Sequence, residues 1–169
     1  MIQNIVIEGP NNVGKSTLIN KLLNCERFKL WKTEHITERS PNTMEFYDAT
    51  LRNCRNTIFD RHCIGETIYP LLFNRTNNIT PNQMLDLVKE HANTLFVIIS
   101  ADLNFINMAY DKKREIPNWY FITEERQMFE DAADMLLEQC PNVIFHMNQS
   151  ECERMEELVT YIIDACEEH

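Results

Sequence analysis

The segment 9–17, with the sequence GPNNVGKST, carries the most specific chemical pattern in the chain. It fits Gly-x-x-x-x-Gly-Lys-[Ser/Thr] completely and follows an apolar run at residues 5–7. Its glycines allow a tight turn whose N–H groups point at a phosphate, and a helix that begins near Lys15 turns its positive end toward the same anion. Lys15 is placed to reach the β- and γ-phosphates, and Ser16 to bind Mg²⁺. The pattern predicts binding of a nucleoside triphosphate. The expected nucleotide contacts are Gly9, Asn12, Val13, Gly14, Lys15, Ser16 and Thr17.

Asp60 and Arg61 form a second chemical pattern, at the end of the short apolar run 57–59. A carboxylate that ends a strand beside the loop 9–17 can help to hold Mg²⁺. An adjacent arginine can bind a phosphate through two parallel hydrogen bonds from its planar guanidinium group. An ordinary surface ion pair is the alternative. The nearby phosphate-binding loop favours a role at the site for both residues.

The elements that must position these residues alternate between strands and helices. The hydrophobic pattern predicts strands at residues 3–8, 28–36, 57–60, 94–100 and 143–147. Helices are expected at 15–24, 40–54, 64–73, 81–91, 102–110 and 123–138, with capping boxes at 80–83 and 150–153, the second before a final helix. Strands joined by crossover helices indicate an α/β fold, a five-stranded parallel sheet with helices on both faces. Because no internal boundary is visible, we expect one domain over residues 1–169.

Composition and charge argue against several classes of protein. The 169 residues have a formal charge of −10, whereas a large nucleic-acid surface requires basic patches. No apolar run approaches the roughly 18 residues of a membrane span. The six cysteines include no Cys-x-x-Cys pair, so we expect free thiols in a cytoplasmic protein. The histidines lack the spacing of metal ligands, which disfavours a zinc site.

With these patterns the chain resembles the thymidylate kinase and deoxynucleoside kinase group, which has the P-loop kinase fold. The residues that carry the resemblance are Glu8-Gly9, Asn11, Gly14-Lys15-Ser16-Thr17, Asp60-Arg61, Gly65-Glu66 and Tyr69. Thymidylate kinases have Asp-Arg-Tyr after the third strand, which Asp60-Arg61-His62 matches better than the Glu-Arg-Ser of deoxynucleoside kinases. The resemblance implies transfer of the γ-phosphoryl group of ATP, with Mg²⁺, to a (deoxy)nucleoside monophosphate. It also implies that Arg61 contacts the transferring phosphates and that Asp60 positions Mg²⁺.

The chain departs from this family at two positions of the loop. Asn11 stands where thymidylate kinases usually carry an aspartate that contacts the acceptor sugar, so it can hydrogen-bond there without adding charge. Asn12 stands where some members place an arginine on the donor phosphates. Members without that arginine supply basic residues from a mobile lid, and Lys112, Lys113 and Arg114 occupy the matching place in a lid loop expected at about residues 111–121. A solvated charged turn is the alternative.

The resemblance also suggests residues that bind the acceptor. Arg39 lies where family members place an arginine on the acceptor phosphate, although helix capping alone explains the adjacent Ser40 and Pro41. Tyr69 and Phe73 lie on a predicted helix and are candidates for contact with the acceptor base. Packing in the core is the alternative for both aromatic side chains.

Other functions stay open beside a kinase that acts on a small nucleotide. A nucleoside acceptor is one, because it would need a carboxylate base and Glu34 and Glu38 follow or end the second strand. A non-catalytic ATP-binding module is another, although such a protein would be expected to lose Asp60-Arg61 or the basic cluster. A GTPase would need an [Asn/Thr]-Lys-x-Asp segment to recognise guanine, and the chain has none. A homodimer is also left open.

Overall fold

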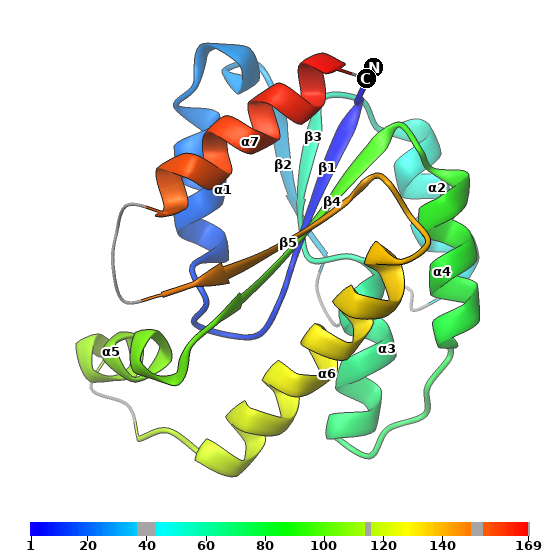
Figure 1. Cartoon of the computed structure of the whole chain (residues 1–169). Coiled ribbons are helices and arrows are strands. Elements are labelled where there is room, and N and C mark those ends of the chain that lie inside the picture. Colours follow the sequence, from blue (N-terminus) through cyan, green and yellow to red (C-terminus); the bar gives the residue numbers. More distant parts are fainter. Residues whose placement is uncertain (37–42, 114–115, 150–153, 169) are drawn as a thin grey trace.

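The computed structural model describes residues 1–36, 43–113, 116–149 and 154–168 (Figure 1). Its strands are all parallel and form one sheet in the order β2-β3-β1-β4-β5. They are β1 (Asn4–Glu8), β2 (Lys32–His35), β3 (Thr57–Asp60), β4 (Thr94–Ala101) and β5 (Val143–Asn148). The predicted α/β fold is confirmed. Because parallel strands end at one edge of the sheet, the segments that follow them gather there.

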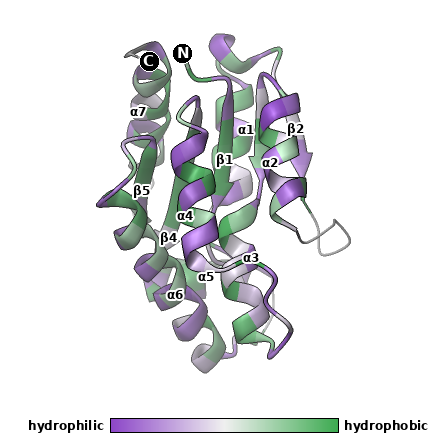
Figure 2. Ribbon diagram, turned by 90° about the vertical axis from the view of Figure 1, so that its right-hand side faces the viewer, coloured by the Kyte–Doolittle hydropathy of each residue, from purple (hydrophilic) through white to green (hydrophobic). Residues whose placement is uncertain are grey.

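Helices cover both faces of the sheet. They are α1 (Lys15–Leu23), α2 (Met44–Asn53), α3 (Cys63–Leu72), α4 (Pro81–Glu90), α5 (Leu103–Lys113), α6 (Trp119–Leu137) and α7 (Arg154–Glu168). Figure 1 shows α1 and α7 on one side of the sheet and α2, α3, α4 and α6 on the other. The strands β1 and β4 are buried along their whole length, and their central residues are hydrophobic (Figure 2), as expected for strands covered on both faces.

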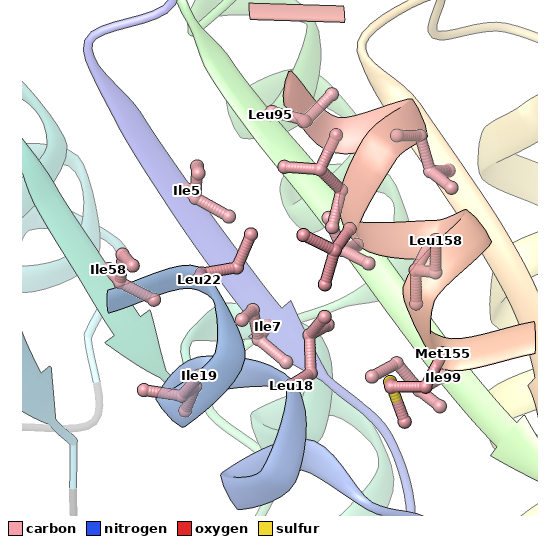
Figure 3. Packing of buried hydrophobic residues seen from close by; sticks show 14 of the residues in the cluster. Ile5, Ile7, Leu18, Ile19, Leu22, Ile58, Leu95, Ile99, Met155 and Leu158 are labelled. Carbon is pink, nitrogen blue, oxygen red and sulfur yellow. The ribbon is translucent and has the colours of Figure 1, made fainter. Parts of the chain in front are cut away.

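The alternation of side chains along β1 divides the core into two clusters. Ile5 and Ile7 pack in one cluster with Leu18 of α1 and Leu158 of α7, where Figure 3 shows them between the two helices and the sheet. Val6 points the other way and packs in the cluster under α2, α3, α4 and α6. The two clusters cover the two faces of the sheet and so fix the strands β1, β3 and β4, whose carboxyl ends carry the segments of the site.

The predicted starts of two helices can be compared with the N-caps in the structure. The Thr80 hydroxyl accepts a hydrogen bond from the backbone N–H of Gln83, and the Gln83 side chain accepts one from the backbone N–H of Thr80. The capping box before α4 is therefore confirmed. The described part of α2 begins at Met44, and its N-cap is Thr43. The predicted cap at Ser40 and the capping box at 150–153 lie outside the described residues.

Two predicted boundaries are wrong. Phe28 belongs to a short 3₁₀ turn, Glu26–Phe28, instead of the second strand, because its fully buried ring packs edge-on against Trp31 and in the core. The segment expected as a lid loop at 111–121 contains helix at both of its ends. Residues 111–113 form the last turn of α5, and α6 already begins at Trp119, with Asn118 as its N-cap. Lysines complement the negative end of a helix, which explains why α5 extends through them.

None of the described helices has the length and apolar character that a membrane span requires. Five cysteines lie within the described ranges, and each of these is a free thiol: Cys25, Cys54, Cys63, Cys140 and Cys166.

Candidate nucleotide-binding site

The phosphate-binding loop joins β1 to α1 and needs glycine at both ends. Gly9 has φ 142°, and a Cβ atom there would lie 2.0 Å from the carbonyl oxygen of Ile99 in β4. Gly14 has φ 99° and immediately precedes α1. Each position requires a backbone conformation that favours glycine. The loop is therefore wrapped against the sheet, and the first N–H groups of α1 are turned toward the space above it.

Lys15 lies across this loop and is only 8% exposed. Its ammonium group donates hydrogen bonds to the carbonyl oxygens of Gly9, at 2.8 Å, and Pro10, at 2.5 Å. Burial, with a contribution from the positive charge of Arg61, lowers the pKa of Lys15 to about 8. A phosphate bound at the loop would place a further negative charge beside this buried cation.

The loop is also anchored by Asn148, the last residue of β5. Its Nδ2 donates a hydrogen bond to the carbonyl oxygen of Val13, and both residues are buried. Val13 thus contributes its backbone and not its side chain to the site. This contact could not be predicted from the sequence, because 135 residues separate the two partners.

Glu8 fixes the backbone that carries Arg61. Its side chain is fully buried, and its Oε1 accepts hydrogen bonds from the N–H groups of His62, Ile64 and Gly65, at 2.8, 3.0 and 3.2 Å. Burial raises the pKa of Glu8, while the N–H donors act in the opposite direction. Arg61 itself has φ 75°, which is uncommon for a residue with a side chain, and its N–H donates to Ile7 O at 3.0 Å. The strained turn after β3 is thus held by hydrogen bonds on both sides.

A hydrogen-bond network holds the Arg61 side chain beside the loop. Its Nη2 donates to Asn11 Oδ1 at 2.7 Å, and its guanidinium carbon lies 5.2 Å from the centre of the Tyr69 ring. Glu125 of α6 accepts hydrogen bonds from the backbone N–H and the Nδ2 of Asn11, both at 3.2 Å, and from the Tyr69 hydroxyl at 2.8 Å. Glu125 is 1% exposed, and burial raises its pKa. No role was predicted for Glu125, because nothing in the pattern of an amphipathic helix marks one glutamate as buried.

Tyr69 belongs to this network and Phe73 lies beside it, and neither residue lines the pocket described below. Their rings stack at 6.2 Å, and Phe73 also approaches Phe121 at 5.3 Å. Phe73 is 47% exposed, so the alternative of core packing does not describe it fully.

Asp60 and His35 end the neighbouring strands β3 and β2, where they are direct partners in the sheet. Asp60 Oδ2 lies 3.0 Å from His35 Nδ1, while Asp60 Oδ1 is buried without a hydrogen-bond partner. Within the described ranges, no three His, Cys, Asp or Glu side chains gather to hold a metal ion. An orphaned carboxylate oxygen together with the hydroxyl of Ser16 nevertheless fits Mg²⁺, because this ion takes few protein ligands when phosphates and waters supply the others. The role of His35 was not predicted.

These elements enclose a pocket of about 720 Å³ above the loop. Its floor is formed by residues 12 and 14–17. One side, which we call the charged wall, is formed by Asn11, His35, Asp60 and Arg61. The opposite side, which we call the α5 wall, is formed by Phe105, Met108, Ala109, Lys112 and Lys113, with Gln149 beside it.

The structure thus brings together most of the predicted site residues whose placement it describes. Lys113 donates a hydrogen bond to the side chain of Asn12, so a basic residue of the expected lid does reach the loop, although from a helix. Arg39 and Arg114 lie outside the described residues, as does Glu38.

The fold and the loop geometry define a P-loop protein of the nucleotide-binding class. A family model described as 50S ribosome-binding GTPase matches residues 4–102, more than half of the chain, and the chain belongs to that family. The match extends from β1 to the end of β4. A comparison with curated proteins gives no significant match.

Solved structures with similar folds include nucleotide and nucleoside kinases. The YorR protein from Bacillus subtilis, in complex with phosphorylated GDP, has a TM-score of 0.75 at 19% identity, over 97% of this chain and 95% of that chain. Thymidylate kinase from Candida albicans has a TM-score of 0.54 at 16% identity, over 98% and 91% of the two chains. Deoxyadenosine kinase from M. mycoides, with bound dATP, has a TM-score of 0.56 at 16% identity, over 95% and 99%. At these identities the similarity establishes the kinase-like fold.

Proposed function

We propose that this protein is a kinase that transfers the γ-phosphoryl group of ATP to a (deoxy)nucleoside monophosphate, in the manner of thymidylate kinases. The observation that carries the proposal is the position of Arg61, which the network of Asn11, Tyr69 and Glu125 holds in the charged wall beside Lys15. Two fixed cations over one phosphate-binding loop suit a reaction that brings two phosphate groups together.

The residues of the pocket would divide the work as follows. The amides of the loop and Lys15 bind the β- and γ-phosphates, and Arg61 stabilises the negative charge that spreads over the transferring group. Ser16 and Asp60 would hold Mg²⁺, which when bound neutralises charge on the same phosphate oxygens. Asn11, fixed by Glu125, is placed to hydrogen-bond the acceptor. Lys112, Lys113 and Arg114 are the proposed lid residues, and Arg39 remains a sequence-based candidate for the acceptor phosphate.

A phosphate acceptor needs no strong general base, because its second proton has a pKa near 6. A nucleoside acceptor needs a base close to its hydroxyl. Glu34, a candidate for that base, does not line the pocket, and its carboxylate accepts a weak contact from the Cys54 thiol at 3.9 Å. This arrangement favours the monophosphate over the nucleoside as acceptor.

The test is to incubate the protein with Mg·ATP and a panel of nucleosides and nucleoside monophosphates, and to follow ADP formation and the phosphorylated product. We expect a monophosphate to give a diphosphate product. Lys15→Ala is the matched inactive control and should remain folded by circular dichroism. Phosphorylation of nucleosides in preference to monophosphates would support a nucleoside kinase. Binding of ATP without transfer to any acceptor would support a binding module.

A further inference from the structure

One face of α5 points into the pocket along its whole length. Phe105, Met108, Ala109 and Lys112 are spaced at i, i+3, i+4 and i+7, the spacing of one helix face, and all four line the pocket. The first three are apolar, and the lysines follow in the last turn. The α5 wall therefore changes from apolar to cationic along the helix.

Phe105 lies directly against the phosphate-binding loop. The tip of its ring is 3.7 Å from the position that a Cβ atom on Gly14 would occupy, and the rest of the ring packs on the core. Met108, one turn later, is 47% exposed. An aromatic ring and a flexible thioether thus border the pocket immediately beside the turn that would bind phosphate.

The two walls leave one side for the base of the donor nucleotide. The phosphates are fixed by the floor of the pocket, residues 14–17. A base against the charged wall would remove water from Asp60 and Arg61 without pairing them, which costs free energy. A base against the α5 wall would instead cover Phe105 and Met108, which is favourable.

We infer that the donor base packs on Phe105 and Met108, and that this site selects the triphosphate and discriminates weakly between bases. The inference rests on the donor site of the proposed function. Stacking and thioether contacts act on the π-face that all bases share, whereas selection of one base requires polar groups at its edge. Phe105, Met108 and Ala109 of the α5 wall have no polar side-chain atoms that could contact the edge of a base. Gln149, beside this wall, has an uncharged polar side chain.

The sequence gives independent support for weak base selection. The chain belongs to a family whose description is 50S ribosome-binding GTPase. It nevertheless lacks the [Asn/Thr]-Lys-x-Asp segment that a GTPase needs to recognise guanine. We therefore expect ATP and GTP to bind with dissociation constants within about tenfold of each other, the ratio that corresponds to a small difference in contacts.

The test is equilibrium binding of ATP, GTP and inorganic tripolyphosphate, each with Mg²⁺ and without any acceptor, to the whole chain. Phe105→Ala should weaken ATP and GTP alike, by roughly tenfold, as expected for loss of one base–aromatic stack. Tripolyphosphate, which has no base, should bind the variant as it binds the wild type. Leu103→Ala is the matched control, since Leu103 is an exposed apolar residue of the same helix that does not line the pocket.

Two further variants keep the test decisive if Phe105→Ala does not fold. Phe105→Leu retains apolar volume without the aromatic face, and Met108→Ala changes an exposed side chain, so both should weaken the two nucleotides in the same direction. The inference is overturned if wild-type affinities for ATP and GTP differ by more than about 100-fold, a difference that requires base-edge contacts. It is also overturned if these variants leave both nucleotides unaffected or weaken only one. Because no acceptor is present, the result does not depend on the kinase assay, and each proposal can fail alone.

Discussion

The two walls of the pocket are built in different ways. In the charged wall, hydrogen bonds link Arg61 to Asn11 and Asp60 to His35. A further hydrogen bond links Asn11 to the buried carboxylate of Glu125. In the α5 wall, apolar side chains face the pocket, and the lysines at its end are exposed. Directional hydrogen bonds fix the positions of charges, whereas apolar contact tolerates different shapes. The comparison suggests that the first wall determines the geometry of transfer and the second determines how the donor is retained.

The largest effect is expected at Arg61, in the charged wall. Arg61→Ala should lower kcat/KM for a monophosphate by roughly 10- to 150-fold, the loss of a charge-assisted hydrogen bond of about 1.5–3 kcal/mol. Arg61→Lys keeps the positive charge but loses the planar guanidinium group that donates a hydrogen bond to Asn11 and lies over the Tyr69 ring. Its activity should therefore lie between those of Arg61→Ala and the wild type. Steady-state kinetics for both variants measures this. Full activity in Arg61→Ala would remove the charged wall from the mechanism.

A smaller effect is expected in the α5 wall. The double variant Lys112→Ala/Lys113→Ala should lower kcat/KM for ATP by about tenfold, because two exposed cations near the phosphates are lost. Lys29→Ala/Lys32→Ala removes the same charge from exposed positions that do not line the pocket, and it serves as the control. Equal effects of the two double variants would mean that only net charge matters and that the lysines of α5 have no direct role.

Glu125 allows the hydrogen-bond network to be weakened without changing its shape. Glu125→Gln replaces charge-assisted hydrogen bonds to Asn11 and Tyr69 by neutral ones, and should raise KM for the acceptor by about fivefold, with little change in KM for ATP. Glu124→Gln, at the neighbouring exposed position, is the control. If KM for ATP rises instead, the network supports the donor and the assignment of the charged wall to the acceptor is wrong.

The remaining effect is on stability and not on catalysis, and it concerns His62, whose backbone N–H donates a hydrogen bond to Glu8 beneath the charged wall. Its ring is 1% exposed, and burial lowers its pKa to about 3. Below pH 6.5 the unfolded chain binds a proton that the folded state does not, so the stability contribution is complete above this pH and is lost as pH falls. From pH 7.5 to 5.5 the wild type should lose about 1.4 kcal/mol more of its free energy of unfolding than His62→Phe does.

Urea unfolding of both proteins at the two pH values, in EDTA, measures this difference. The comparison between the two proteins cancels the other titrating groups, including Asp48, whose pKa is lowered by the Arg52 side chain. Parallel pH dependence in the wild type and His62→Phe would contradict a buried neutral histidine.

The same comparison explains how much could be predicted from the sequence. The placement of Lys15, Asp60 and Arg61 around one pocket could be predicted because it depends on local order, a strand followed by a turn of fixed length. Glu125 and Asn148 were missed because they reach the loop from 114 and 135 residues away. The lid loop was predicted at 111–121 from its charged residues and its position in the chain, and the extension of α5 through Lys113 was missed because the end of a helix also favours lysines.

The central claim is that this pocket holds a triphosphate and a monophosphate end to end over one loop. It is tested most directly by the affinity for dinucleoside polyphosphates that contain both substrates in one molecule. A pentaphosphate has the three phosphates of the donor, the one of a monophosphate acceptor and one additional phosphate that spans the gap between them, and a tetraphosphate is the corresponding match for a nucleoside acceptor. The account predicts that the best pentaphosphate of an acceptor panel binds at least about 100-fold more tightly than ATP, since one linked ligand uses both subsites, and that Arg61→Ala removes most of this gain. Equal affinity for ATP and every pentaphosphate, or tighter binding of the tetraphosphates, would contradict it.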